Sequence, residues 1–279
     1  MKKLMNTLYV TSENSYLALD GENIVVYEEK AEVGRLPLHN LEGIVSFGYR
    51  GTSPALMGAC ADRNISLCYL TPQGKFLARV TGKMKGNVIL RQQQYQSSQD
   101  EKISLSIAKN CILGKVYNAR WVLERAIRDH SMQIDVIKVK SASEKLKNSL
   151  EYIQNCQTKE QLRGYEGEAA SVYFGVLDEL ILQQKKDFTF QGRNKRPPLD
   201  NMNAMLSFVY TLLTNTITSA LECLHTDRPG RASLSLDLIE ELRSVLADRF
   251  VLSLVNKKIV GGKNFKKKEN GAVLMDDEL

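Results

Sequence analysis

Two carboxylates and one histidine of this chain have the types and spacing of a site for a divalent cation. Glu166 stands on the apolar face of an amphipathic helical pattern, where an ionised carboxylate needs a salt bridge, a proton or a cation. His225 precedes the pair Pro229-Gly230, which predicts a turn ahead of the next helix. That turn returns the next helix, which carries Glu240, toward the histidine. The three side chains are therefore predicted to converge.

The chemistry of such a site would be phosphoryl transfer. Asp237 and Glu240 are three residues apart and share one side of their helix. Carboxylates with one imidazole and no thiolate are hard ligands that suit Mg²⁺ or Mn²⁺. A bound ion of this kind polarises a phosphate and helps to deprotonate a water or a 3′-hydroxyl. The arginines expected to contact phosphates nearby are Arg228, Arg231 and Arg243.

The same residues also have structural interpretations, which the sequence leaves open. Glu166 can be a buried carboxylate that pairs with Arg163 or with another basic residue. A single histidine before a turn is more often part of the loop than a ligand. Gly164 and Gly167 flank Glu166, and each costs a helix about 1 kcal/mol relative to alanine, which indicates a close approach to the backbone there.

The elements that must position these residues fall into two parts. From Thr7 to about Gly82, short β-rich runs alternate with turns, and the pairs Asp20-Gly21 and Gln73-Gly74 are typical of hairpins. One helix, residues 54–64, is expected within this part. From Glu101 onward the apolar period changes to about 3.6 residues, which predicts long helices.

We therefore predict an α+β fold with two domains. Residues 1–91 form a small β-rich domain, and the Gln/Ser-rich residues 92–100 form a linker. Residues 101–279 form a larger, all-α catalytic domain. Its lysine-rich, Gly-interrupted end, from about residue 256, is expected to be mobile or ordered by a partner.

Composition narrows the class of protein further. The formal charge of +6 and the pI near 8.9 suit a surface that binds a polyanion. Five cysteines without a C-x-x-C pair favour reduced, buried thiols over disulfides or structural zinc. No apolar run reaches the roughly 20 residues that span a bilayer, and the N-terminus lacks the apolar core of a signal peptide. We expect a cytoplasmic protein.

Three segments of the chain resemble the signature segments of the CRISPR-associated integrase family, the adaptation nuclease of CRISPR systems. They are LRGYEGEAASVYF, RPPLDNMNAMLSFVYTLL and LHTDRPGRASLSLDLIEELR, in the family's order over roughly residues 162–243. The β-rich part is similar to the family's smaller domain. Two departures are visible: a Gly-containing loop usual before the Leu224-His225 pair is missing, and members commonly continue with further helices beyond the position of Leu279.

The resemblance implies a site and an activity. Glu166, His225 and Glu240 would bind Mg²⁺ or Mn²⁺, with Asp237 as the accompanying acidic residue; members often have Asp where Glu240 stands. The implied reaction is transesterification, in which the 3′-hydroxyl ends of captured DNA are joined to a CRISPR repeat, together with endonuclease activity. The residues expected to contact DNA or to support the site are Arg163, Asn203, Arg228, Arg231 and Arg243.

The resemblance also implies an assembly. The β-rich domain would form a homodimer, and dimers would hold a small ferredoxin-like adaptation partner together with double-stranded DNA and the repeat. Two other hypotheses stay open: a branched-DNA repair nuclease that uses water as the nucleophile, and a catalytically silent nucleic-acid-binding scaffold in which Glu166 is salt-bridged. An assay that separates joined strands from cut strands distinguishes the integrase from the repair nuclease.

Overall fold

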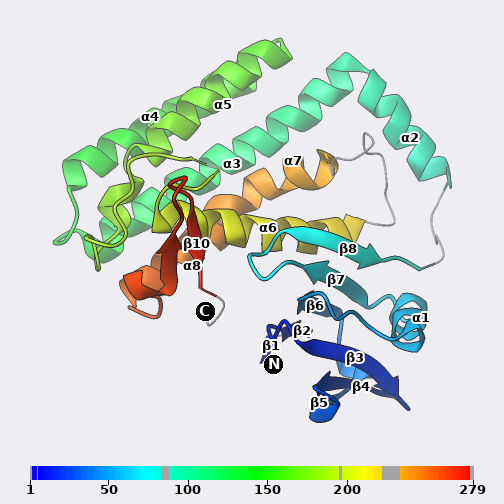
Figure 1. Cartoon of the computed structure of the whole chain (residues 1–279). Coiled ribbons are helices and arrows are strands. Elements are labelled where there is room, and N and C mark those ends of the chain that lie inside the picture. Colours follow the sequence, from blue (N-terminus) through cyan, green and yellow to red (C-terminus); the bar gives the residue numbers. More distant parts are fainter. Residues whose placement is uncertain (1, 5, 83–87, 195–196, 222–232, 277–279) are drawn as a thin grey trace. The chain divides into compact units, whose positions relative to one another are not determined.

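The computed structural model describes the chain except for residues 1, 5, 83–87, 195–196, 222–232 and 277–279 (Figure 1). The chain divides into two compact units. The first consists mainly of Met1–Asn87, and the second begins at Val88. Among the described residues, no helix has both the length and the apolar character needed to cross a membrane.

The first unit is β-rich, as predicted. Its larger sheet has the order β1-β2-β6-β7-β8, in which β2, β6 and β7 run parallel and both edge strands run antiparallel to their neighbours. The bounds are β1 Lys2–Leu4, β2 Thr7–Val10, β6 Gly43–Phe47, β7 Ser66–Leu70 and β8 Phe76–Val80. Helix α1, Pro54–Asp62, connects the parallel strands β6 and β7, because parallel neighbours need a crossover.

A second, antiparallel sheet completes this unit. It consists of β3 Ser15–Asp20, β4 Asn23–Glu28 and β5 Ala31–Pro37, and the short 3₁₀ turn η1, Leu38–Asn40, follows it. Gly21 and Gly74 lie at the two predicted hairpin turns with φ of +55° and +81°, a conformation that favours glycine. The core includes the fully buried side chains of Leu8, Ile24 and Leu67.

The second unit is mostly helical. Its helices are α2 Val88–Gln99, α3 Glu101–His130, α4 Val136–Asn155, α5 Lys159–Phe174, α6 Asn201–Leu221, α7 Ser233–Leu242 and α8 Arg249–Asn256. Shorter pieces are η2 Leu177–Leu180, the π-helical η4 Arg243–Asp248 and η5 Gly262–Asn264. The long helix α3 packs against α4, α5, α7 and η4, and the core of the unit forms around it (Figure 1).

Capping side chains fix where several of these helices begin. Asp100 accepts hydrogen bonds from two backbone amides at the start of α3, and Asp135 accepts one at the start of α4. Thr158 caps α5 by accepting from the amide of Gln161, as its sequence predicts. This cap fixes the start of α5, about two helical turns before Glu166.

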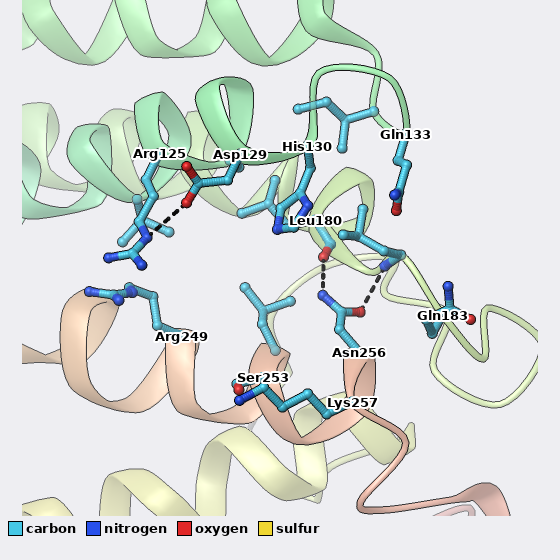
Figure 2. A pocket seen from close by; sticks show the side chains of 15 residues that line it. Arg125, Asp129, His130, Gln133, Leu180, Gln183, Arg249, Ser253, Asn256 and Lys257 are labelled. Carbon is cyan, nitrogen blue, oxygen red and sulfur yellow. Dashed lines mark hydrogen bonds and ion pairs between the residues drawn. The ribbon is translucent and has the colours of Figure 1, made fainter.

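A cavity of about 600 Å³ lies between the C-terminal half of α3 and α8 (Figure 2). Arg125, Arg249 and Lys257 are among the residues that line it, and Asp129 forms an ion pair with Arg125 at 3.1 Å. At one end Asn256 donates to the carbonyl of Leu180 at 2.9 Å, which holds α8 against η2. The cavity contains neither Glu166 nor Glu240.

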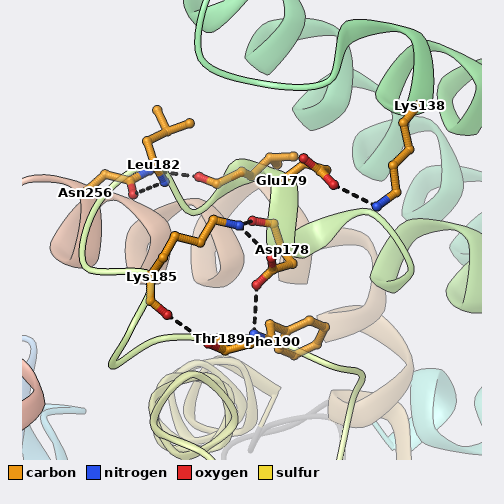
Figure 3. Close-up of polar contacts among 9 residues, drawn as sticks. Lys138, Asp178, Glu179, Leu182, Lys185, Thr189, Phe190 and Asn256 are labelled. Carbon is orange, nitrogen blue, oxygen red and sulfur yellow. Dashed lines mark hydrogen bonds and ion pairs between the residues drawn. The ribbon is translucent and has the colours of Figure 1, made fainter.

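Polar contacts also hold the irregular segment that follows η2 (Figure 3). The Asp178 carboxylate accepts from the amide of Phe190 at 2.8 Å and pairs with Lys185 at 2.5 Å. Glu179 pairs with Lys138 of α4 at 2.7 Å. These contacts fix the path of the chain between α5 and α6.

Two expectations about organisation are wrong. The expected linker at 92–100 is helical, since α2 covers Val88–Gln99; a Gln-rich run is polar enough to resemble a linker, yet glutamine is a good helix former. The basic end of the chain is ordered where it is described. Strands β9 Phe265–Lys267 and β10 Val273–Met275 form a hairpin, so the second domain is not all-α. Phe265 packs on Phe188 with centroids 5.6 Å apart, which anchors the hairpin to the core.

Candidate functional site

Glu166 and Glu240 meet at one ammonium group. The Lys115 Nζ lies 2.6 Å from Glu166 Oε1 and 2.8 Å from Glu240 Oε2. The three residues come from α5, α7 and α3, and their side chains are 33%, 16% and 19% exposed for Glu166, Glu240 and Lys115. The structure therefore brings together the two glutamates that the sequence placed in one site. The counter-charge that Glu166 was expected to need is the Lys115 ammonium, not Arg163.

Close packing of α7 on α3 places Glu240. A Cβ at Gly114 would lie 3.0 Å from the side chain of Glu241, so the glycine leaves room for α7 at this point. One turn further along α3, Asn118 Nδ2 donates to the carbonyl of Glu241 at 2.7 Å. By contrast, a Cβ at Gly164 or Gly167 would meet no described atom within 4 Å, so the close approach expected at these two glycines is not made by the described residues.

The second oxygen of Glu240 is bound by Arg243. The guanidinium Nη1 lies 2.5 Å from Glu240 Oε1, and the guanidinium carbon lies 4.9 Å from the centroid of the Tyr210 ring. Glu240 Oε2 is buried and forms an ion pair with the Lys115 ammonium at 2.8 Å. In the absence of DNA, Arg243 holds a carboxylate; its expected contact with phosphate stays a prediction. Glu240 thus lies between two cations.

A buried carboxylate, Asp248, lines the same small cavity as Glu240 and Arg243. Asp248 accepts hydrogen bonds from the hydroxyls of Tyr173 at 3.0 Å and Tyr210 at 2.5 Å. Burial raises the pKa of the Asp248 carboxyl to about 6, against the lowering effects of the two hydroxyls and of Arg243 and Arg193. Burial likewise raises the pKa of both tyrosines well above the usual value. The buried carboxyl thus accepts from two tyrosine hydroxyls that burial keeps protonated.

The signature residue Asn203 belongs to the same region but has no access to solvent. Its side chain is fully buried, accepts from Arg193 Nη1 at 2.7 Å and donates to Asp200 and to the carbonyl of Gly192. The expectation that Asn203 contacts DNA is therefore wrong, because it has no exposed surface. Its hydrogen bonds hold Arg193, Asn194 and Gly192 against the start of α6.

The remaining predicted residues are dispersed or undescribed. His225, Arg228 and Arg231 lie outside the described residues, as does the shortened loop before the histidine. Asp237 is exposed on α7, and Arg163 is exposed on α5. Over the described ranges, no three His, Cys, Asp or Glu side chains gather closely enough to hold a metal ion. Of the three predicted ligands, the structure describes Glu166 and Glu240 and brings them to one ammonium group; their role as metal ligands stays a prediction.

Sequence reasoning missed Lys115 and Asp248. Lys115 stands in the run GKVYNARW, where a lysine at a helical position reads as an ordinary surface residue. Asp248 follows the apolar stripe of α7, and nothing in its neighbourhood predicts burial. A signal exists for Lys115 in hindsight, since the adjacent Gly114 marks a close helix contact at the same turn.

The family model described as CRISPR associated protein Cas1 matches residues 8–279. The chain belongs to the Cas1 family. The CRISPR-associated endonuclease Cas1 1 of Chlorobaculum tepidum is 45% identical over 287 residues, an alignment that covers all of this chain and 84% of the relative. The alignment therefore spans both the β-rich and the helical part of this chain.

Solved structures show the same fold. A casposase bound to its integration product has a TM-score of 0.78 at 21% identity and covers 98% of this chain and 79% of its own. A chain of a Cas6-RT-Cas1–Cas2 complex has a TM-score of 0.76 at 20% identity, over 98% of this chain and 30% of its own. The β-rich and helical parts found here are thus those of a Cas1 fold.

Proposed function

We propose that this Cas1 protein is a CRISPR adaptation integrase. It joins the 3′-hydroxyl ends of captured DNA to a CRISPR repeat by transesterification, and it cuts DNA at the same site. One observation carries the proposal: Glu166 and Glu240, from distant signature segments, converge on a single cation, the Lys115 ammonium. The membership of the Cas1 family supports it, as does the name endonuclease given to the relative from Chlorobaculum tepidum.

The residues present fit a divalent metal ion. The Lys115 ammonium stands where a cation would bind both carboxylates, 2.6 Å from Glu166 Oε1 and 2.8 Å from Glu240 Oε2. Carboxylate oxygens are the ligands that Mg²⁺ and Mn²⁺ prefer. Glu166 and Glu240 would hold the ion with His225, and Asp237 would accompany them. A bound ion supplies positive charge to the phosphoryl oxygens and acidity to the attacking hydroxyl.

The residues of the chain itself prepare this site. Lys115 neutralises the facing carboxylates and keeps them close before an ion enters, and Arg243 fixes the far oxygen of Glu240. If a divalent ion were bound by the two carboxylates, the Lys115 ammonium would be free to pair with a DNA phosphate. Arg163, exposed on the same helix as Glu166, contributes a further phosphate contact.

The substrates and partners belong to the same proposal. Double-stranded DNA with free 3′ ends and repeat DNA are the substrates, and the β-rich domain forms a homodimer in the cytoplasm. The structurally similar casposase was solved with an integration product, and the other similar chain lies in a complex with Cas2. These likenesses favour DNA and a small ferredoxin-like adaptation protein as partners.

A strand-joining assay tests the function. The protein, with and without its small adaptation partner, is mixed with a labelled duplex and a supercoiled plasmid that carries a CRISPR repeat, in Mg²⁺ or Mn²⁺. We expect covalent joining that Glu166→Ala abolishes. Glu168→Ala is the matched control, because Glu168 is an exposed carboxylate on the same helix, and it should keep joining.

The assay also separates the alternatives. Plasmid cutting without joining would favour the branched-DNA nuclease. DNA binding that ignores Mn²⁺, with no product of either kind and no effect of Glu166→Ala, would favour the silent scaffold.

A further inference from the structure

We propose that Asp248 is a positioning residue that sets the distance between the two metal-binding glutamates. The inference rests on the proposed function, since it concerns the same pair of carboxylates. Asp248 itself touches neither Glu166 nor Glu240: the partners of its carboxylate are Tyr173 and Tyr210. Its effect on the site therefore passes through these two tyrosines.

Tyr173 connects Asp248 to Glu166. Both Tyr173 and Glu166 lie on α5, seven residues apart, which is about two helical turns and puts them on one face. The hydrogen bond from the Tyr173 hydroxyl to Asp248 Oδ2, at 3.0 Å, ties this face of α5 to the end of η4. The rotation of α5, and with it the direction of Glu166, is fixed by this bond.

Tyr210 connects Asp248 to Glu240. Its hydroxyl donates to Asp248 Oδ1 at 2.5 Å, and two guanidinium groups lie over its ring, with Arg243 at 4.9 Å and Arg193 at 5.2 Å from the ring centroid. Arg243 in turn holds Glu240 Oε1 at 2.5 Å. Moving the Tyr210 ring would therefore move the arginine that orients Glu240.

The contacts close into a ring. From Asp248 they run through Tyr210 and Arg243 to Glu240, then through Lys115 to Glu166, and back along α5 and Tyr173. Lys115, Tyr173, Tyr210, Glu240, Arg243 and Asp248 all line one small cavity of about 50 Å³, so these side chains face the same space. A closed ring of short contacts restricts each member more than any single contact does.

A π-helical turn makes this ring possible. Arg243 and Asp248 are the first and last residues of η4, five positions apart. In an α-helix, residues five apart point about 140° away from each other, whereas i→i+5 hydrogen bonding brings them toward one side. The wider turn thus lets both residues reach Tyr210. Single π-turns inside helices are frequent at functional sites, and here the turn serves to place Glu240.

The test measures Mn²⁺ binding to the full chain without DNA, by calorimetry and by the shift in Tm on adding the ion. We expect Asp248→Asn to fold and to weaken Mn²⁺ binding by about tenfold or more, the effect typical of groups that orient metal ligands. Tyr210→Phe keeps the aromatic ring that both arginines contact but loses the hydroxyl, and should weaken Mn²⁺ binding by about threefold. The double variant should bind Mn²⁺ no more weakly than Asp248→Asn, because both changes break the same closed ring of contacts.

Asp178→Asn is the matched control, since Asp178 is a carboxylate of the same unit that bonds only to its own loop (Figure 3). It should lower Tm and leave Mn²⁺ binding unchanged. Wild-type Mn²⁺ affinity in both Asp248→Asn and Tyr210→Phe would overturn the positioning role. If Asp248→Asn fails to fold, the Mn²⁺ affinities of Tyr210→Phe and Tyr173→Phe test the positioning role, and wild-type affinity in both would overturn it.

Glu166→Ala in the same titration keeps this inference distinct from the proposed function. Loss of Mn²⁺ binding in Glu166→Ala with normal binding in the Asp248 and tyrosine variants refutes the positioning role only. Normal Mn²⁺ binding in Glu166→Ala itself refutes the metal site and thereby the basis of both.

Discussion

Replacing Lys115 with methionine should make the protein bind Mn²⁺ more tightly. The ammonium lies 2.6 Å and 2.8 Å from the two glutamates, and a metal ion must displace it to reach the same oxygens. Methionine keeps most of the length of the side chain but removes its charge. The competition for the carboxylates, and the repulsion between the ammonium and a bound ion, both disappear in Lys115→Met.

The burial of the ion pairs sets the size of the effect. Exposed ion pairs contribute about 0–1 kcal/mol, and breaking a fully buried pair costs about 3–5 kcal/mol. The three side chains are between 16% and 33% exposed, so they lie between these limits. We expect the ammonium to oppose metal binding by about 1–2 kcal/mol, which corresponds to roughly a tenfold gain in Mn²⁺ affinity in Lys115→Met.

The same substitution should destabilise the metal-free protein by about 1 kcal/mol, because Glu166 and Glu240 lose the cation they share. Calorimetric titration with Mn²⁺ measures the affinity, and Tm with and without Mn²⁺ measures the stability. Lys115→Arg keeps the charge and should bind Mn²⁺ no more tightly than the wild type. Weaker or equal Mn²⁺ binding in Lys115→Met would show that the ammonium does not occupy a cation site.

Three further predictions follow from the structure. Burial raises the pKa of Asp248 to about 6, so this carboxyl makes stability fall as pH rises between about 4 and 6. The Tm of Asp248→Asn relative to the wild type should therefore rise over that range, and parallel pH curves would contradict this. Gly114→Val should push α7 from α3, lower stability by about 1–3 kcal/mol and weaken Mn²⁺ binding; chemical denaturation and calorimetry measure both, and unchanged values would refute the close packing. Arg163→Ala should weaken DNA binding and reduce the slope of log K against log salt by about 0.9, whereas Arg128→Ala, away from the site, should leave the slope unchanged.

Local patterns predicted much of the fold. The hairpin turns at Gly21 and Gly74, the helix α1 and the cap at Thr158 depend on neighbouring residues only, and the structure has all of them. The β-rich and helical parts also follow from the change in apolar period. The linker at 92–100 failed because polarity, which marks a loop, also marks the exposed helix α2. The ordered hairpin of β9 and β10 depends on a distant partner, Phe188, that no local pattern names.

In the candidate site, too, local features could be predicted and long-range contacts could not. Glu166 and Glu240 were predictable because a charged residue on or beside an apolar helical face needs a partner. The identity of that partner could not be predicted, because Lys115 is 51 residues from Glu166 along the chain. The buried ring around Asp248 depends on a π-turn, and the sequence RSVLAD does not distinguish a π-turn from an α-helix.

The most direct test of the central claim is to sequence the junctions formed when a labelled duplex with free 3′-hydroxyls meets repeat DNA in Mn²⁺. The integrase account predicts covalent junctions at the repeat from the wild type and from Glu240→Asp, which keeps a carboxylate, and none from Glu166→Ala. Junctions from Glu166→Ala at the wild-type level, or cut strands without junctions from the wild type, would contradict it.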